Sequence, residues 1–177
     1  ESRIGHQYLA GGLAAVWATA NTREAIFDAM MRREVYATTG PRMAVRMFGG
    51  WNFAASIFAG DWVKTAYAKG VPMGGNLALG KGAPSFIVQA QKDPMGANLD
   101  RVQIVKGWVD AKGAPQEKIY DVVWSAPKQR RLVKGKLTPV GDTVNLATAS
   151  YTNSIGAPEL RTVWRDPDYK AGQKAFY

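Results

Sequence analysis

Two strand-forming stretches, SFIVQAQ at residues 85–91 and RVQIVKGWV at residues 101–109, decide the fold class of this chain. Both are rich in β-branched and other apolar residues, which favour a pleated, half-buried strand. Turn signals follow them: Asp93-Pro94 after the first stretch and Asp110–Gly113 after the second. The pattern returns at residues 118–125, 143–151 and 159–165, and it begins again at residues 176–177. Short strands at this spacing predict a β-sandwich.

The residues before these strands follow a different pattern. Asn21 followed by Glu24 forms a capping box, and apolar residues at helical spacing come after it, so we predict a helix over residues 21–33. The apolar segment at residues 12–18 fits either a buried strand or an irregular connection. The other predicted elements are strands over residues 35–39 and 43–48 and a short helix around residues 61–67. The predicted fold class is therefore mainly β, and α+β overall.

The counts of chemically specialised residues exclude several classes of protein. The 177 residues contain no Cys and one His, His6, so no disulfide framework, cysteine-type zinc site or thiol nucleophile fits this sequence. A Ser–His–Asp triad would have to use His6, and no G-x-S-x-G elbow accompanies it. The sequence has neither a signal peptide pattern nor an apolar run of roughly 18–20 residues that could span a membrane. It begins at Glu1 rather than Met and stops abruptly, which favours a piece of a longer chain.

The positive charge is concentrated in one segment. Lys and Arg total 23 against 14 Asp and Glu, which gives a net charge of +9. The densest cationic run contains no acid: Lys128, Arg130, Arg131, Lys134 and Lys136. Such a run could bind nucleic acid or an anionic surface. No aromatic residue interleaves with it to stack bases, and no DNA-binding motif accompanies it. We therefore favour a solvated loop and predict no nucleic-acid partner.

The most suggestive polar segment is Thr38-Thr39-Gly40-Pro41-Arg42, at the end of a predicted strand. Thr38, Thr39 and Arg42 supply two hydroxyls and a guanidinium, which could face a small anionic substrate because Arg binds anions through bidentate contacts. Ordinary strand-end chemistry is the alternative interpretation, and the spacing alone favours it.

Carboxylates supply further candidates. Asp93 with Asp100, or Asp166 with Asp168, could act as a pair of acids. Asp93, Asn98 and Asp100 lie in one loop and could bind calcium through oxygen ligands. Their spacing is not that of an EF-hand, however, and a turn before Pro94 explains Asp93 more simply.

Six tryptophans are many for a chain of this length. Most are predicted to lie in the core, because Trp124 and Trp164 fall within strand patterns. Trp51 and Trp62 lie next to turns and are the candidates for an exposed surface that binds carbohydrate or a protein partner.

A resemblance to a known family runs in order over nearly the whole chain. The stretches that carry it are GGLAAVWA at 11–18, NTREAIFDAM at 21–30, YATTGPR at 36–42, FGGW at 48–51, KGVPMGG at 69–75, KDP at 92–94 and GANLDRVQIVKGW at 96–108. The chain resembles the C-terminal part of a bacterial family called the domain-of-unknown-function 3604 family.

The resemblance implies an architecture. Full-length members look like secreted or periplasmic proteins whose N-terminal part is similar to the PHP metallohydrolases, a distorted α/β barrel with a metal cluster. Residues 1–45 would then be the C-terminal remnant of the barrel, with the helix at 21–33 and the strand at 35–39, and residues 46–177 a β-rich, sandwich-like domain.

The resemblance also implies a function. The chain would be the C-terminal portion of a metal-dependent hydrolase of phosphate, sulfate or similar esters, whose divalent-metal ligands lie upstream. No metal ligand can be placed on this sequence, so the chain alone is expected to be inactive and its missing barrel portion would be its main partner. Thr38, Thr39 and Arg42 would border the metal site. The alternative is a non-catalytic β-sandwich that binds carbohydrate or a protein partner.

Overall fold

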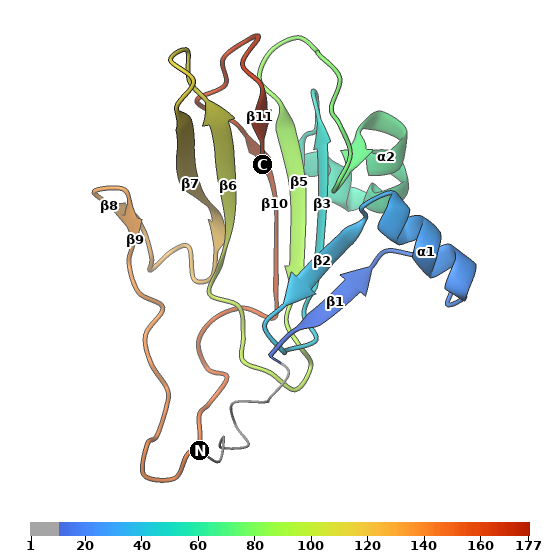
Figure 1. Ribbon diagram of the computed structural model, residues 1–177. Helices are drawn as coiled ribbons and strands as arrows, with labels where there is room; N and C mark the ends of the chain where they lie inside the picture. Colours follow the sequence, from blue (N-terminus) through green and yellow to red (C-terminus); the bar gives the residue numbers. More distant parts are fainter. Residues whose placement is uncertain (1–10) are drawn as a thin grey trace, which may run out of the picture.

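The computed structural model describes residues 11–177 and is built mainly of antiparallel β-sheet (Figure 1). The largest sheet has the strand order β10-β5-β3-β4. Its strands are β3 (Ala44–Gly50), β4 (Val71–Pro72), β5 (Ser85–Gln91) and β10 (Glu159–Arg165). The central strand β5 pairs along its whole length with both β3 and β10. The predicted strands at residues 85–91 and 159–165 are confirmed; β5 is almost wholly buried, whereas β10 is mostly half-buried.

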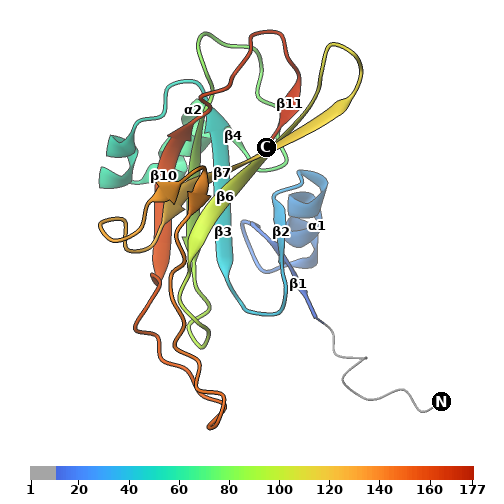
Figure 2. The ribbon, with the colours of Figure 1, turned by 90° about the vertical axis from the view of Figure 1, so that its left-hand side faces the viewer.

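The second sheet has the order β11-β6-β7 and consists mostly of one long hairpin. Its strands are β6 (Arg101–Val109), β7 (Pro115–Trp124) and β11 (Ala175–Phe176). The turn forms as predicted because the Asp110 carboxylate accepts hydrogen bonds from the backbone N–H groups of Lys112 and Ala114. In Figure 2 this hairpin runs obliquely in front of β3, on one side of the large sheet.

Aromatic side chains join the two sheets. The rings of Tyr120 on β7 and Trp164 on β10 lie 4.9 Å apart, and those of Phe86 on β5 and Tyr177 lie 4.3 Å apart. Because side chains alternate along a strand, Ile87 points away from this contact to the opposite face of β5. The mainly β prediction is therefore confirmed, with each face of β5 buried.

Helical segments cover that opposite face. They are the 3-10 helix η2 (Ala55–Ala59) and the helix α2 (Trp62–Lys69), which begins where the Asp61 carboxylate accepts from the Lys64 N–H group. The buried cluster beneath them contains Phe48, Phe53, Ala66 and Ile87. Among the described residues, no helix is long and apolar enough to cross a membrane.

An N-terminal unit lies beside the large sheet. It contains β1 (Leu13–Val16), α1 (Arg23–Met31) and β2 (Val35–Thr38), and β1 pairs antiparallel with β2. The ambiguous segment at 12–18 is thus a strand. Successive strands of an α/β barrel run parallel, so a barrel origin of this unit rests on the family resemblance and not on its pairing.

Side chains fasten this unit to the main sheet. The buried Glu34 accepts a hydrogen bond from Tyr67 on α2, and Arg46 on β3 donates to the Tyr67 hydroxyl over 3.2 Å. The Arg46 guanidinium also lies 4.2 Å from the centre of the Trp17 ring, a cation–π contact. The predicted division at residue 45 remains a prediction, and these contacts cross it.

Two sequence predictions were wrong in detail. Thr22, rather than Asn21, caps α1, and its hydroxyl accepts from the Ala25 N–H group. The predicted strand at 143–151 is an exposed loop with a single bridge between Asn145 and Ser150. The Asn145 side chain accepts from two following N–H groups, and this local turn competes with strand formation. No buried surface lies beneath the alternating residues, since Leu146 is 90% exposed.

Candidate functional site

Two loops that carry sequence candidates meet at one end of the main sheet. Thr38 ends β2, Thr39 and Arg42 follow it in the β2–β3 loop, and Asp93 and Asn98 lie in the β5–β6 loop. These loops adjoin because Ala44, at the start of β3, pairs with Gln91, at the end of β5. The Arg42 N–H group donates to Asp93 Oδ2 over 2.5 Å. The structure thus links two candidate segments that are 51 residues apart in sequence.

Asp93 holds this end of the protein together. Its Oδ1 atom accepts from the Met95 N–H group over 2.9 Å, while Oδ2 accepts from Arg42. These backbone hydrogen bonds, that from Arg42 first, hold the pKa of the Asp93 carboxyl below its ordinary value. Asp93 is therefore a carboxylate that positions the turn before Arg42, as well as serving the turn before Pro94.

The loop that follows β5 is fixed by a lysine. The Lys92 ammonium donates to the carbonyl groups of Asp93, Pro94 and Gly96, at 2.9, 3.0 and 3.0 Å. One cation thus satisfies three backbone acceptors of a tight loop. The Lys92 ammonium therefore stabilises its own loop, which lies next to Arg42.

Asn98 joins the same loop to residues 153–155. Its backbone N–H group donates to Asn153 Oδ1 over 3.0 Å. Its side-chain amide donates to the carbonyl groups of Asn153 and Ile155 over 3.0 and 2.9 Å. Asn98 is thus a bridge between two loops.

The turn with the two threonines leaves polar groups at the surface. Thr38 Oγ1 accepts from the Gly40 N–H group over 3.3 Å, and Gly40 has a φ of 131°, which a residue with a side chain rarely adopts. Thr39 and Arg42 are exposed, and neither side chain has a hydrogen-bond partner within residues 11–177. A hydroxyl and a guanidinium are therefore available here for an anionic group.

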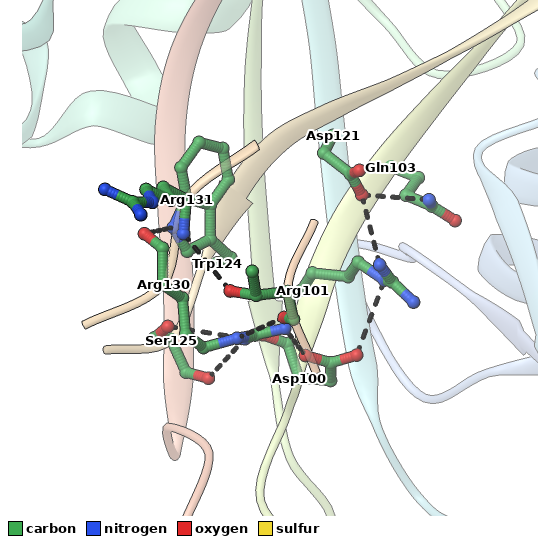
Figure 3. A network of polar contacts seen from close by, with 9 residues as sticks. Asp100, Arg101, Gln103, Asp121, Trp124, Ser125, Arg130 and Arg131 are labelled. Carbon is green, nitrogen blue, oxygen red and sulfur yellow. Dashed lines mark hydrogen bonds and ion pairs between the residues drawn. The ribbon is translucent and has the colours of Figure 1, made fainter. Parts of the chain in front are cut away.

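Asp100 belongs to a separate polar network, centred on Arg130 (Figure 3). Arg130 is 5% exposed, and Asp100 Oδ1 lies 2.6 Å from its Nη2 atom as an ion pair. Arg130 also donates to the Asp100 and Ser125 carbonyl groups, to Ser125 Oγ and to the Thr138 carbonyl group. One member of the cationic run predicted to be a solvated loop is thus a buried anchor.

The network continues along the β6–β7 hairpin. Asp100 Oδ2 lies 3.4 Å from Arg101 Nε, and Arg101 also approaches Asp121 at 3.7 Å. Gln103 donates to Asp121 over 2.9 Å. Figure 3 shows these side chains in a row across the two strands, where they fix the hairpin register.

The two tryptophan candidates have different surroundings. Trp62 packs edge-on against Phe48 and Phe58 beside the buried cluster. Trp51 donates from its indole N–H group to the Ala78 carbonyl group and contacts the Tyr169 ring. Each ring is half-buried and has aromatic neighbours of its own.

Sequence reasoning missed a charged network between the two sheets. Lys106 Nζ and Asp166 Oδ2 lie 2.6 Å apart with exposed side-chain fractions of 2% and 0%. The Tyr177 hydroxyl donates to the same oxygen over 2.6 Å. One signal in the sequence could have revealed it: Lys106 lies two residues after the apolar Ile104 on a predicted strand, so both side chains point to the same, buried face.

The second half of this network is nearer the surface. Asp168 accepts from Lys118 and, over 2.7 Å, from the Tyr120 hydroxyl. These hydrogen bonds, that from Lys118 first, hold the pKa of the Asp168 carboxyl below its ordinary value. Burial, followed by donation to Asp168, raises the pKa of Tyr120, so Tyr120 remains a neutral donor. The candidate pair Asp166 and Asp168 therefore joins the sheets rather than forming an open pair of acids.

The oxygen ligands proposed for calcium do not fit a metal site. Both Asp93 oxygens accept backbone N–H groups, and both Asp100 oxygens pair with guanidinium groups. The amide nitrogen of Asn98 donates to carbonyl groups. Within residues 11–177, no group of three or more His, Asp or Glu side chains is placed to hold a metal ion. His6 lies outside the described residues.

The fold and its loops define a mainly β protein built from several antiparallel sheets. The sequence model of the family described as "Protein of unknown function (DUF3604)" matches residues 1–177. The chain belongs to this family. Comparisons with curated proteins and with solved structures give no match.

Proposed function

We propose that this chain is the C-terminal portion of a metal-dependent, PHP-like hydrolase that acts on a phosphate, sulfate or similar ester. The resemblance described above supplies the reaction class and a periplasmic or secreted location. In this proposal the divalent-metal ligands belong to an upstream barrel, and no catalytic step runs through residues 11–177. The role of this chain is to bind the substrate anion.

The observation that carries the proposal is the exposed pair Thr39 and Arg42. Arg42 can bind two oxygens of an ester anion at once, and the Thr39 hydroxyl can donate to a third. Asp93 accepts a hydrogen bond from the backbone N–H group of Arg42 itself. Because this backbone is already ordered, less conformational entropy is lost when the anion binds. Such contacts are made in the ground state and the transition state alike, and they act mainly on KM.

The surface of α1 is consistent with an upstream partner. Phe27, Met30 and Met31 lie on one helical stripe and are each about half exposed or more. A contiguous apolar stripe of this kind is a common docking surface. In the proposal it packs against the barrel, and the Arg42 turn lies at the other end of β2.

The test uses the full-length protein, purified with Mn²⁺ or Zn²⁺, on a panel of phosphate and sulfate esters. Arg42→Ala should raise KM roughly 10- to 100-fold, as expected for a lost charge-assisted hydrogen bond, and leave kcat nearly unchanged. Arg42→Lys should recover only part of the loss. The matched control is Arg131→Ala, another exposed arginine, which should leave both constants unchanged.

Two results would contradict the proposal in different ways. No turnover of any ester would end the hydrolase assignment. Turnover with an unchanged KM in Arg42→Ala would end the role of the Thr39–Arg42 site while leaving the reaction class in place.

A second candidate function, non-catalytic binding of a carbohydrate or protein partner, is favoured by a groove along the β6–β7–β11 sheet. The groove has a volume of about 570 Å³, and Trp108, Gln116 and Phe176 contribute to its lining. Phe176 is 71% exposed, and such a ring can stack on a sugar face. If glycan binding to the full-length protein occurs and survives Phe176→Ala, this groove is not its site.

A further inference from the structure

The β8–β9 hairpin concentrates exposed positive charge on a small surface. It consists of β8 (Leu132–Val133) and β9 (Lys136–Leu137). No acid occurs between Asp121 and Asp142. Four cations of this segment are exposed: Lys128, Arg131, Lys134 and Lys136. Arg130 is the buried exception and serves as the anchor (Figure 3).

The hairpin has a regular, hydrogen-bonded structure. Lys134 and Gly135 have φ values of 50° and 76°, the left-handed pair that a tight two-residue hairpin turn requires. At its base, the Thr138 N–H group donates to the Arg131 carbonyl group over 3.1 Å, and the Arg131 N–H group donates to Thr138 Oγ1 over 3.3 Å. The backbone of the turn that bears Lys134 and of the base that bears Arg131 is therefore ordered before any ligand binds.

Apolar side chains lie among these charges. Leu132 and Val133 are each 47% exposed, whereas Leu137, the cross-strand partner of Leu132, is buried. A cleft of about 650 Å³ adjoins the base of the hairpin, and Lys128 and Arg131 contribute to its lining. Val133 pairs with Lys136 and therefore shares its face of the hairpin, whereas Leu132 lies on the other face with the buried Leu137. Val133 thus lies beside an exposed cation, and the cleft adjoins the same hairpin.

We propose that the β8–β9 hairpin binds the surface of a lipid bilayer that carries anionic headgroups. The four cations complement the headgroup phosphates, and the cleft can admit one of them. Val133, on the same face as Lys136, enters the boundary between headgroups and acyl chains, a role that a soluble polyanion would not give it. Nucleic acid is disfavoured because no aromatic residue lies within residues 125–141 to stack on bases. This surface is distinct from the proposed ester site.

The test is co-sedimentation of the full-length protein with phosphatidylcholine vesicles prepared with and without the anionic lipid phosphatidylglycerol. Binding should require the anionic lipid and fall as salt increases. Because each cation near such a surface contributes about a fivefold factor in partitioning, the double variant Lys128→Glu, Lys136→Glu should bind at least about 25-fold more weakly. The matched control is Lys64→Glu, Lys81→Glu, which changes the net charge equally at two exposed lysines elsewhere and should retain most of the binding.

A second pair of variants tests the apolar contact. Val133→Ser should weaken vesicle binding several-fold, whereas Val144→Ser, at a valine of similar exposure (56% against 47%) in another loop, should not. Equal binding to uncharged vesicles would overturn the proposal, as would equal losses in the two charge variants. So would tight binding to a sulfated polysaccharide without binding to vesicles. Thermal unfolding of each variant verifies that it is folded.

Discussion

Lys106 on β6 and Asp166 after β10 form a fully buried ion pair that joins the two sheets, with 2.6 Å between Nζ and Oδ2. The Lys106 ammonium also donates to the Asp168 carbonyl group, and Tyr177 donates to Asp166. The charged groups therefore satisfy one another at a position that is shielded from solvent. Such a pair specifies how the sheets meet, because any displaced arrangement would leave a charge without its partner.

Lys106→Met should destabilise the protein by about 3–5 kcal/mol, because it leaves the Asp166 carboxylate buried without its cation. Urea unfolding measures this loss. The double variant Lys106→Met, Asp166→Asn should lose less than the single variant, since no net charge then remains buried. Lys118→Met, in the exposed half of the network, should shift the unfolding midpoint only slightly. A double variant less stable than either single variant would contradict this account.

Acid should destabilise the protein through three carboxyls with lowered pKa. The ordinary value is 3.8, and the Arg42 N–H group lowers the pKa of Asp93, the Ala114 N–H group that of Asp110, and Lys118 that of Asp168. Between the folded and unfolded pKa values the unfolded state binds more protons, so stability rises with pH there. The stabilisation is present above about pH 4 and is lost as the pH falls through the folded values.

Asp93→Asn should therefore flatten the acid limb of a plot of unfolding free energy against pH. The measurement is urea unfolding at a series of pH values from neutral to strongly acid. Asp28→Asn, at an exposed carboxylate on α1 whose side chain has no hydrogen bond to the described residues, is the matched control. An unchanged acid limb in Asp93→Asn would show that its hydrogen bonds to Arg42 and Met95 do not contribute.

Arg130→Met should destabilise the protein by about 2–4 kcal/mol, below the range for a fully enclosed pair because Asp100 is partly exposed. Arg130→Lys should recover little, because an ammonium cannot reproduce the planar guanidinium fork that reaches Asp100, Ser125 and Thr138. Arg131→Met, at the next residue and exposed, should stay within about 0.5 kcal/mol of the original protein. Equal losses at positions 130 and 131 would refute the anchor role.

Gly74 and Gly82 allow a steric contact to be separated from backbone strain. Their φ values are 79° and 81°, but a Cβ on Gly74 would lie 2.3 Å from the Arg33 carbonyl oxygen, whereas one on Gly82 would meet nothing within 4 Å. Gly82→Ala should cost about 1–2 kcal/mol from strain alone. Gly74→Ala should cost about 3–5 kcal/mol, because it also displaces the junction of α1 and β2. Similar melting temperatures for the two variants would show that the junction of α1 and β2 can shift to accommodate the Cβ at almost no cost in free energy.

Local sequence patterns predicted much of the secondary structure. β5 and β10 lie where the strand patterns predict them, and Asp61 caps α2. The failure at 143–151 has a physical cause, since alternation of small polar and apolar residues creates a strand only where a neighbouring strand and a buried face are present. No local signal distinguishes that segment from a true strand.

For the candidate site too, the sequence identified individual residues but not how they are arranged. The sequence singled out Thr38, Thr39 and Arg42 by residue type, and it singled out Asp93 independently. Only the pairing of β3 with β5 brings the two loops together and turns Asp93 into the support for Arg42. Likewise, nothing local distinguishes Arg130 from the exposed Arg131.

The sequence by itself determined the mainly β class, the absence of cysteine chemistry and the unequal distribution of charge, because these depend on composition and on periods of a few residues. The tertiary structure alone decided which charges are buried. Lys106 meets Asp166 across 60 residues, and Asp100 meets Arg130 across 30. The reason is physical: the free energy of a charge depends on its distance from a counter-charge and from water, and sequence spacing fixes neither.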